Sequence, residues 1–143
     1  MSALPHQATG VAIDGAGGPR GVLIEGAPGS GKSSLALALI DRGAVLIGDD
    51  GVLLERRGDR LWASPPPAIE GMLEIRNLGL VRVPAAPAPV ALVLRLDREA
   101  PRYVDAASEV ELLGLNLPLI RLLPDSPVLA LRAEWALTLY GAA

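Results

Sequence analysis

Gly26-Ala27-Pro28-Gly29-Ser30-Gly31-Lys32-Ser33 is the stretch that decides how this sequence folds. It satisfies the phosphate-binding loop pattern G-x-x-x-x-G-K-[ST] at every fixed position. Residues 21–25 before it form a short apolar run typical of a buried strand, and residues 33–43 after it are predicted to form a helix that ends in glycine. Strand, glycine-rich loop and helix in this order are the context that the motif requires.

The residue types in this stretch suit the binding of a nucleoside triphosphate. Glycines let the backbone turn its N–H groups toward phosphate oxygens, and the N-terminus of the next helix adds partial positive charge. The Lys32 ammonium is expected to reach the β- and γ-phosphates and the Ser33 hydroxyl to face a magnesium ion. Lys32 is the only lysine in the chain, and every other basic residue is arginine. The sequence therefore predicts an ATP site formed by Gly26, Ala27, Pro28, Gly29, Ser30, Gly31, Lys32, Ser33 and Ser34.

Composition narrows the class of protein. The chain has 143 residues, which is typical of one domain, expected over residues 1–143. It contains no cysteine, so disulfides, thiolate metal sites and cysteine nucleophiles are excluded. Its net charge of −3 argues against nucleic acid as a partner. No apolar run is long enough for a membrane span, and residues 1–6 lack a signal-peptide pattern, so a cytoplasmic protein without membrane contact is expected.

The patterns around the loop predict a β-rich α/β fold with one helix after the loop and one at the C-terminus. Residues 64–68 read as a stiff connector, residues 69–81 as a half-buried strand pattern, and residues 83–90, which are rich in proline, as a loop. Strands are expected within 1–9, over 10–14 and 21–25 as a hairpin, over 44–47, over 52–55 and 60–63 as a second hairpin, over 91–97, and within 110–123, broken by Gly114 and Pro118. The C-terminal helix is expected over 128–139, with Ser126 as its N-cap and Pro127 at its first position.

Two adjacent acids, Asp49 and Asp50, follow the strand predicted over 44–47. Neighbouring residues at a strand end point to opposite faces, so one acid can face the metal of the nucleotide and the other an incoming hydroxyl as general base. A solvated Asp-Asp-Gly turn is the alternative interpretation. Glu74 fits a strand-edge ion pair with Arg76 as well as a catalytic role, and composition alone places His6 on a surface terminus.

The motifs together resemble the catalytic domain of the HPr kinase/phosphorylase family, bifunctional enzymes that phosphorylate a serine of the phosphocarrier protein HPr. The resemblance covers roughly residues 6–83. It rests on four landmarks in order: His6 ahead of the loop, the loop running into Leu35-Ala36-Leu37-Ala38-Leu39-Ile40-Asp41-Arg42-Gly43, the pair Asp49-Asp50, and Leu73-Glu74-Ile75-Arg76-Asn77-Leu78-Gly79-Leu80. The resemblance also implies a nucleotide fold shared with phosphoenolpyruvate carboxykinase.

The resemblance implies roles for particular residues. Lys32 would bind the β- and γ-phosphates, Ser33 and Glu74 would ligate Mg²⁺ with Asp50 on the metal side, and Asp49 would accept the proton of the substrate serine. His6 would sit beside the transferring phosphate. The implied partner is HPr or a relative of it from the nitrogen phosphotransferase system, and the family's oligomers imply a homo-oligomer.

Three departures from the family pattern shape the expected activity. The chain is expected to lack the family's N-terminal domain, like the short single-domain members from some proteobacteria, and Ser34 replaces an acid. The loop that carries the family's arginine looks shortened, with Arg98 or Arg102 as its counterpart, and Pro124-Asp125-Ser126-Pro127 replaces a Pro-Gly-Arg-Asn segment tied to dephosphorylation. We therefore expect an HPr serine kinase whose phosphorylase activity is weak or lost. The alternatives are a small-molecule P-loop kinase and a non-catalytic, ATP-sensing interaction module.

Overall fold

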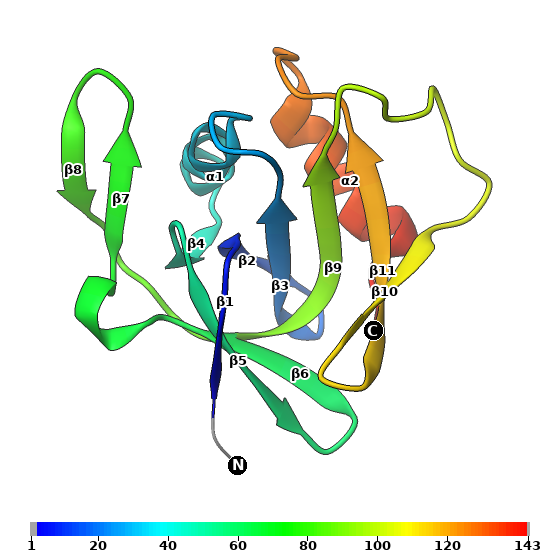
Figure 1. The fold of residues 1–143 in the computed structure, drawn as a ribbon, viewed down its shortest axis with the longest axis horizontal. Coiled ribbons are helices and arrows are strands. Elements are labelled where there is room, and N and C mark those ends of the chain that lie inside the picture. The colour runs from blue at the N-terminus through cyan, green and yellow to red at the C-terminus, as the bar shows by residue number, and fades with distance from the viewer. Residues whose placement is uncertain (1–2, 143) are drawn as a thin grey trace.

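The computed structural model describes residues 3–142, which form a sheet-rich α/β fold with the phosphate loop at one end of the sheet (Figure 1). The α/β class and both expected helices are confirmed. In chain order the elements are β1 (Leu4–His6), β2 (Thr9–Gly15), β3 (Gly18–Glu25), α1 (Lys32–Asp41), β4 (Val45–Gly48), β5 (Val52–Arg57), β6 (Arg60–Ser64), a 3₁₀ turn (Pro67–Ile69), β7 (Met72–Ile75), β8 (Gly79–Arg82), β9 (Ala88–Leu96), β10 (Ser108–Leu112), β11 (Leu115–Leu122) and α2 (Leu129–Tyr140).

Within residues 3–142, nine strands form one sheet and β7 and β8 form a separate hairpin. The main path of the sheet is β1-β5-β6-β9-β3-β2-β4, and β11 pairs with both β9 and β10. β3 lies in the middle, parallel to β9 and antiparallel to β2. Because the phosphate loop follows β3, it leaves the sheet at a central strand, where a ligand site is held by rigid neighbours.

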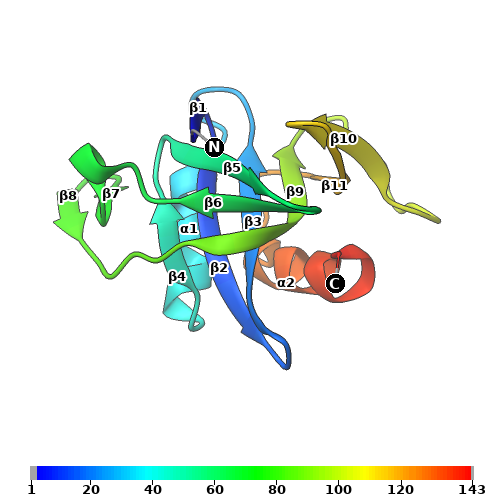
Figure 2. The same ribbon diagram turned by 90° about the horizontal axis from the view of Figure 1, so that it is seen from below.

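The central strand is apolar because both of its faces are covered. Val22 and Ile24 pack with the buried sides of α1 and α2, whereas Leu23 packs with β5 and β6 on the opposite face. Figure 2 shows β5 and β6 on the side of β3 opposite α2. Burial on both faces explains why residues 21–24 read as a continuous apolar run instead of an alternating one.

Helix α1 begins directly at Lys32 and ends in a glycine-dependent cap. Gly43 has a φ of 108°, and the Ala44 N–H donates to the Leu39 carbonyl oxygen at 2.9 Å. This is the hydrogen bond of a Schellman cap, which favours glycine at the left-handed position. The helix end predicted at Gly43 is therefore confirmed. Within residues 3–142, neither helix is long and apolar enough to cross a membrane.

Helix α2 starts later than the sequence predicts. Its N-cap position is Val128, and no side chain caps it. Ser126 instead accepts a hydrogen bond from the Val128 N–H at 3.2 Å, within the turn that precedes the helix. The prediction of Ser126 as N-cap was wrong because its hydroxyl stabilises a local turn, a competing use of serine near helix starts.

Two prolines lie inside strands, although the sequence patterns predicted a loop around Pro89 and a break in the strand at Pro118. Pro89 is in β9, where residues 83–90 were expected to be a loop, and it lies opposite Trp62 of β6, just before β9 begins to pair with β3. Pro118 is in β11, just before that strand begins to pair with β9 at Leu119. At each proline, one edge of the strand has no hydrogen-bonded neighbouring strand, so the missing backbone N–H costs little stability.

The half-buried pattern within residues 69–81 belongs to a hairpin of two strands, β7 and β8. β7 and β8 pair antiparallel, and the turn between them contains Asn77 at a φ of 74°. Leu73 of β7 is fully buried against the α1 side of the core, whereas all of β8 is exposed. Figure 1 shows this hairpin standing beside α1, where it forms one wall of the site described next.

Candidate active site

The phosphate loop has the backbone that its motif requires. Gly29 and Gly31 have φ angles of 78° and 103°, which glycine adopts without steric cost. The Ser30 N–H donates to the Ala27 carbonyl oxygen at 3.0 Å. A Cβ atom on Gly26 would lie 2.6 Å from Ser30 Oγ, so the first glycine of the motif is also needed for space. These residues form a tight loop at the N-terminus of α1.

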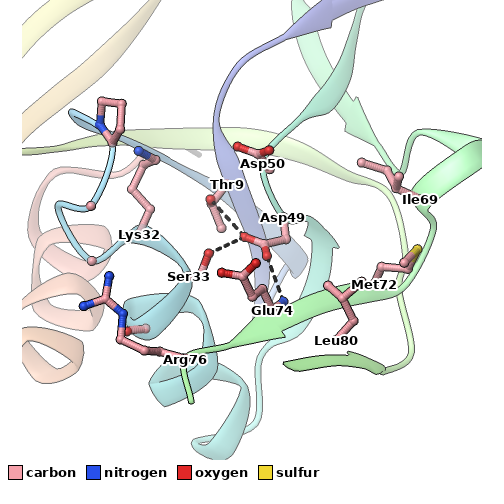
Figure 3. Close-up of a pocket in the computed structure, with 14 residues that line it drawn as sticks. Thr9, Lys32, Ser33, Asp49, Asp50, Ile69, Met72, Glu74, Arg76 and Leu80 are labelled. Atoms are coloured by element: carbon pink, nitrogen blue, oxygen red, sulfur yellow. Dashed lines mark hydrogen bonds between the residues drawn. The ribbon is translucent and has the colours of Figure 1, made fainter. Parts of the chain in front are cut away.

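The two functional side chains of the loop point in different directions. Lys32 Nζ donates to the carbonyl oxygens of Gly26 at 2.8 Å and Ala27 at 3.1 Å, so the ammonium lies across the loop. Ser33 Oγ donates to Asp49 Oδ1 at 2.6 Å. Figure 3 shows Lys32 over the loop and Ser33 directed at Asp49. The loop and the acid that follows β4 are thus joined by a direct side-chain contact.

Asp49 is buried and fully engaged. Its side chain accepts from Ser33 Oγ and from Thr9 Oγ1 at 3.4 Å through one oxygen, and from the Glu74 N–H at 3.1 Å through the other. Only 8% of Asp49 is exposed. A carboxylate held this way next to the hydroxyl of a phosphate loop matches the acid that positions the magnesium ion in P-loop proteins.

Asp50 faces the open cleft instead. It is exposed and lines the same cleft as Lys32 and Ser33. The backbone of Asp50 is left-handed, with a φ of 62°. The regular alternation of side chains along the strand therefore ends at Gly48, and a tight turn sets the directions in which the two acids point. The structure therefore places Asp49 beside Ser33 and Asp50 in the open cleft.

Gly48 makes that turn possible, and its replacement by alanine is expected to be costly. A Cβ atom on Gly48 would clash with the carbonyl oxygen of Gly51, which is backbone and cannot move alone. We expect Gly48→Ala to lower the free energy of unfolding by at least about 1–3 kcal/mol, the usual cost of overpacking. Gly51→Ala is the matched control, because a Cβ there meets nothing within 4 Å. Urea denaturation of both variants measures the difference, and equal stabilities would contradict the role of Gly48.

A cleft of about 480 Å³ joins these groups to the β7–β8 hairpin. The hairpin contributes Glu74, Arg76 and Leu80, and Figure 3 shows the Glu74 carboxylate turned toward Asp49 and Ser33. Thr9, at the start of β2, completes the wall beside Asp49 and is fully buried. The sequence patterns gave no reason to choose Thr9, because its contact with Asp49 joins residues that are far apart in the chain.

The donor atoms near Ser33 suit a magnesium ion. Ser33 offers a hydroxyl, and Asp49 and Glu74 offer carboxylates, so the set contains oxygen donors alone, as Mg²⁺ prefers. Within residues 3–142 there is no group of three or more His, Cys, Asp or Glu side chains placed to hold a metal by themselves. Mg²⁺ is commonly held by one or two carboxylates together with substrate phosphates and water.

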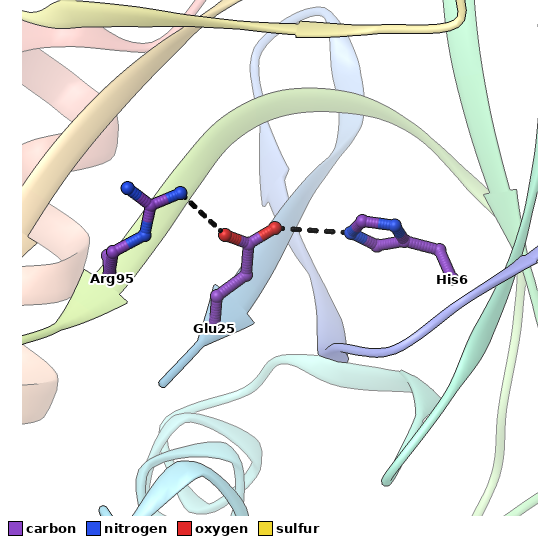
Figure 4. A network of polar contacts seen from close by, with 3 residues as sticks. All are labelled: His6, Glu25 and Arg95. Atoms are coloured by element: carbon purple, nitrogen blue, oxygen red, sulfur yellow. Dashed lines mark hydrogen bonds and ion pairs between the residues drawn. The ribbon is translucent and has the colours of Figure 1, made fainter. Parts of the chain in front are cut away.

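His6 is not among the residues that line this cleft. Its Nε2 lies 3.1 Å from Glu25 Oε2, and Arg95 Nη2 donates to the other Glu25 oxygen at 3.0 Å (Figure 4). Glu25 is the last residue of β3, directly before the phosphate loop. His6 lies on β1, which pairs with β5, whereas Thr9 at the start of β2 reaches Asp49.

This polar network makes the stability of the fold depend on pH. The hydrogen bond from His6 lowers the pKa of Glu25 below its ordinary value, against the opposing effect of burial, and Arg95 lowers it further. The folded state therefore favours the charged carboxylate, so its contribution is present above the unfolded pKa of about 4.5 and is lost as the pH falls through the lower folded value.

We expect Glu25→Gln to reduce this acid sensitivity. Wild type should lose more unfolding free energy than the variant between about pH 5.5 and about pH 3.5, because the glutamine has no proton to take up. Urea denaturation at both pH values measures the two losses. An equal loss in wild type and variant would show that the His6–Glu25–Arg95 network does not contribute.

This chain is similar to known proteins of one family. The family model described as the HPr Serine kinase C-terminal domain matches residues 3–86. The HPr kinase/phosphorylase of Chlorobium phaeobacteroides (strain BS1) is 36% identical over 121 residues, which cover 75% of this chain and 35% of that protein. That of Clostridium tetani (strain Massachusetts / E88) is 46% identical over 65 residues, covering 46% of this chain and 21% of that protein.

A solved structure is similar over nearly the whole chain. The structure of the Hpr(Ser) kinase/phosphatase from Coxiella burnetii has a TM-score of 0.82 and 30% sequence identity, covering 94% of this chain and 88% of that one. The chain spans about a fifth to about a third of the length of the curated relatives named above. The family match over more than half of the chain, together with this structural likeness, shows that the protein belongs to the HPr serine kinase C-terminal domain family.

Proposed function

We propose that this protein is an ATP- and Mg²⁺-dependent kinase that phosphorylates a serine of an HPr-type phosphocarrier protein. The observation that carries the proposal is the single cleft in which the phosphate loop, Asp49, Asp50 and Glu74 meet. Family membership supports the reaction class, and the cleft supplies a phosphate-binding loop, oxygen donors for a metal and a free carboxylate. These are the parts that phosphoryl transfer needs.

In the proposed reaction the serine hydroxyl attacks the γ-phosphorus of ATP. Its oxygen forms the new bond to phosphorus in line with the breaking bond to the β–γ bridging oxygen, and ADP leaves. Asp50 takes the hydroxyl proton, because it is the exposed acid of the pair, whereas Asp49 already accepts three hydrogen bonds. Lys32 stabilises the negative charge on the β- and γ-phosphates, and backbone N–H groups of the loop orient them.

The metal would be held on the Ser33 side of the cleft. Ser33 and Glu74 are its proposed ligands, and Asp49 holds both in place through the Ser33 hydroxyl and the Glu74 backbone. A magnesium ion bound there supplies positive charge to the phosphate oxygens. Asp49 thereby acts as a positioning residue, and Asp50 replaces it as the proposed base.

The C-terminal segment supports the proposal that phosphorylase activity is weak. Arg98, one candidate for the family's loop arginine, is paired with Asp125 at 2.7 Å, within the segment that replaces Pro-Gly-Arg-Asn. Neither Arg98 nor Arg102 lines the cleft. We expect phosphate-dependent release from the seryl-phosphorylated carrier to be slower than the forward transfer, and equal rates would contradict this part of the proposal.

ADP release measured with and without a phosphocarrier tests the proposed kinase. We expect release to be stimulated by an HPr-type carrier and not by the same carrier with its acceptor serine replaced by alanine. Equal stimulation by both carriers would contradict serine as the acceptor. ATP binding without any stimulated turnover would favour the ATP-sensing module instead.

A further inference from the structure

Thr9 and Asp49 are the two buried polar or charged residues in the part of the chain that the structure describes. Thr9 has no exposed surface, and Asp49 is 8% exposed. They contact each other, since Thr9 Oγ1 donates to Asp49 Oδ1 at 3.4 Å. Figure 3 shows Thr9 and Ser33 directed at the same oxygen of Asp49. The fold thus buries a hydroxyl and a carboxylate at the edge of the cleft, where an apolar pair would cost less free energy.

A β-bulge brings these two residues together. β2 and β4 pair antiparallel with a one-residue shift in register, which leaves Ile47 as an extra residue in β4. Continued without the shift, the register would put Ala8 opposite Asp49, whereas with the shift it puts Thr9 there. Bulges commonly lie next to active sites, where they re-aim a side chain. The contact between Thr9 and Asp49 is therefore a product of the bulge.

We infer that Thr9 is a positioning residue for the metal of the site and acts through Asp49. The inference rests on the proposed function, since it takes Mg²⁺ to be held by Ser33 and Glu74. The Asp49 oxygen that accepts from Thr9 also accepts from Ser33 Oγ at 2.6 Å. The other Asp49 oxygen accepts from the Glu74 N–H at 3.1 Å. Because Thr9 is fully buried, it acts on the metal through this carboxylate and not by contact.

The Thr9 hydroxyl fixes the direction in which Asp49 Oδ1 points. The carboxylate of an aspartate rotates readily about its last bond, and the Glu74 N–H holds only one of its oxygens. Thr9 holds the other from a strand of the main sheet. With Oδ1 fixed, the Ser33 hydroxyl donates its single hydrogen to Asp49 and keeps its lone pairs for a metal. Without the Thr9 hydroxyl, Oδ1 is held only by Ser33, the side chain that it should itself position.

Stabilisation of a strand end is the alternative role of Thr9. Thr9 is the first residue of β2 and pairs with Ile24 of the central strand β3. This pairing is made by the backbone, and valine is β-branched like threonine and equally suited to a strand. A purely structural role would therefore survive Thr9→Val, whereas positioning of Asp49 needs the hydroxyl that Thr9→Ser keeps.

Binding of Mn²⁺, used in place of Mg²⁺, to the protein loaded with ADP tests the inference without turnover. Electron paramagnetic resonance measures the free metal. We expect Thr9→Val to weaken Mn²⁺ binding about tenfold and Thr9→Ser to stay within about twofold of wild type, since groups that orient metal ligands are typically worth tenfold or more in affinity. ADP binding in the presence of a chelator should be unchanged in both. Thr138→Val is the matched control, because it removes an exposed threonine hydroxyl on α2.

Phosphoryl transfer by the same variants is measured over a range of Mg²⁺ concentrations. Thr9→Val should need about tenfold more Mg²⁺ for its half-maximal rate, and Thr9→Ser should restore the requirement of wild type. Thermal melting reports whether valine disturbs folding, and Thr9→Ala then takes its place.

Equal Mn²⁺ binding by Thr9→Val and wild type, or an equal loss in Thr9→Ser, would overturn the inference. Wild type that binds ADP but no Mn²⁺ would overturn it together with the metal part of the proposed function. Weakened Mn²⁺ binding by Thr9→Val, when wild type transfers no phosphoryl group, would support the inference while contradicting the kinase.

Discussion

Lys32→Ala should reduce phosphoryl transfer to the carrier by at least about 10²–10³-fold, the usual cost of removing one preorganised group that stabilises transition-state charge. Lys32 is the cation of the phosphate loop, and its ammonium already lies within hydrogen-bond distance of the loop carbonyls. Initial rates at saturating carrier, measured alongside thermal melting, separate this loss from unfolding.

Arg60→Ala is the control for loss of one positive charge. Arg60 is exposed at the start of β6 and does not line the cleft. We expect its transfer rate to match wild type within about twofold. A Lys32→Ala variant that transfers phosphate as fast as Arg60→Ala would contradict a role of the phosphate loop in the proposed reaction.

Asp50→Asn should lower kcat by about 10²–10⁴-fold, the usual contribution of a positioned base, while ATP binding stays near that of wild type. The amide keeps the shape of the side chain but cannot take the serine proton. Asp49→Asn should act differently, because Asp49 accepts from Ser33, Thr9 and the Glu74 backbone. Its replacement should raise the Mg²⁺ concentration needed for half-maximal activity as well as slow turnover.

The two variants are compared in one Mg²⁺ titration of transfer rate. If Asp49→Asn lost turnover with an unchanged Mg²⁺ requirement and Asp50→Asn behaved like wild type, the base would be Asp49, as the resemblance alone implied. The contrast also separates a kinase from an ATP-sensing module, in which neither substitution would change a rate.

Local patterns predicted the phosphate loop and the elements next to it. The phosphate loop, α1 and the hairpin of β2 and β3 are set by residues close together in the chain, by glycines with required conformations and by apolar runs. The sequence also predicted the approximate position of α2. The structural likeness to the Coxiella burnetii protein confirms the α/β class that these elements suggested.

The missed features depend on contacts between distant segments. Thr9 meets Asp49 across 40 positions, and Glu74 meets Asp49 across 25, so no local pattern could pair them. The directions in which the side chains of Asp49 and Asp50 point depend on a left-handed residue within a tight turn. The alternation of side chains along a strand does not predict such a turn. The contact of His6 with Glu25 likewise joins distant segments, since His6 lies on β1, which pairs with β5.

The central claim is that this cleft transfers the γ-phosphoryl group of ATP to a serine of a phosphocarrier protein. The most direct measurement is the intact mass of an HPr-type carrier after incubation with the protein, ATP and Mg²⁺, followed by peptide mapping. We predict a gain of one phosphoryl group, located on a serine and absent with Lys32→Ala. A carrier of unchanged mass, in the presence of wild-type protein that binds ATP, would contradict the claim.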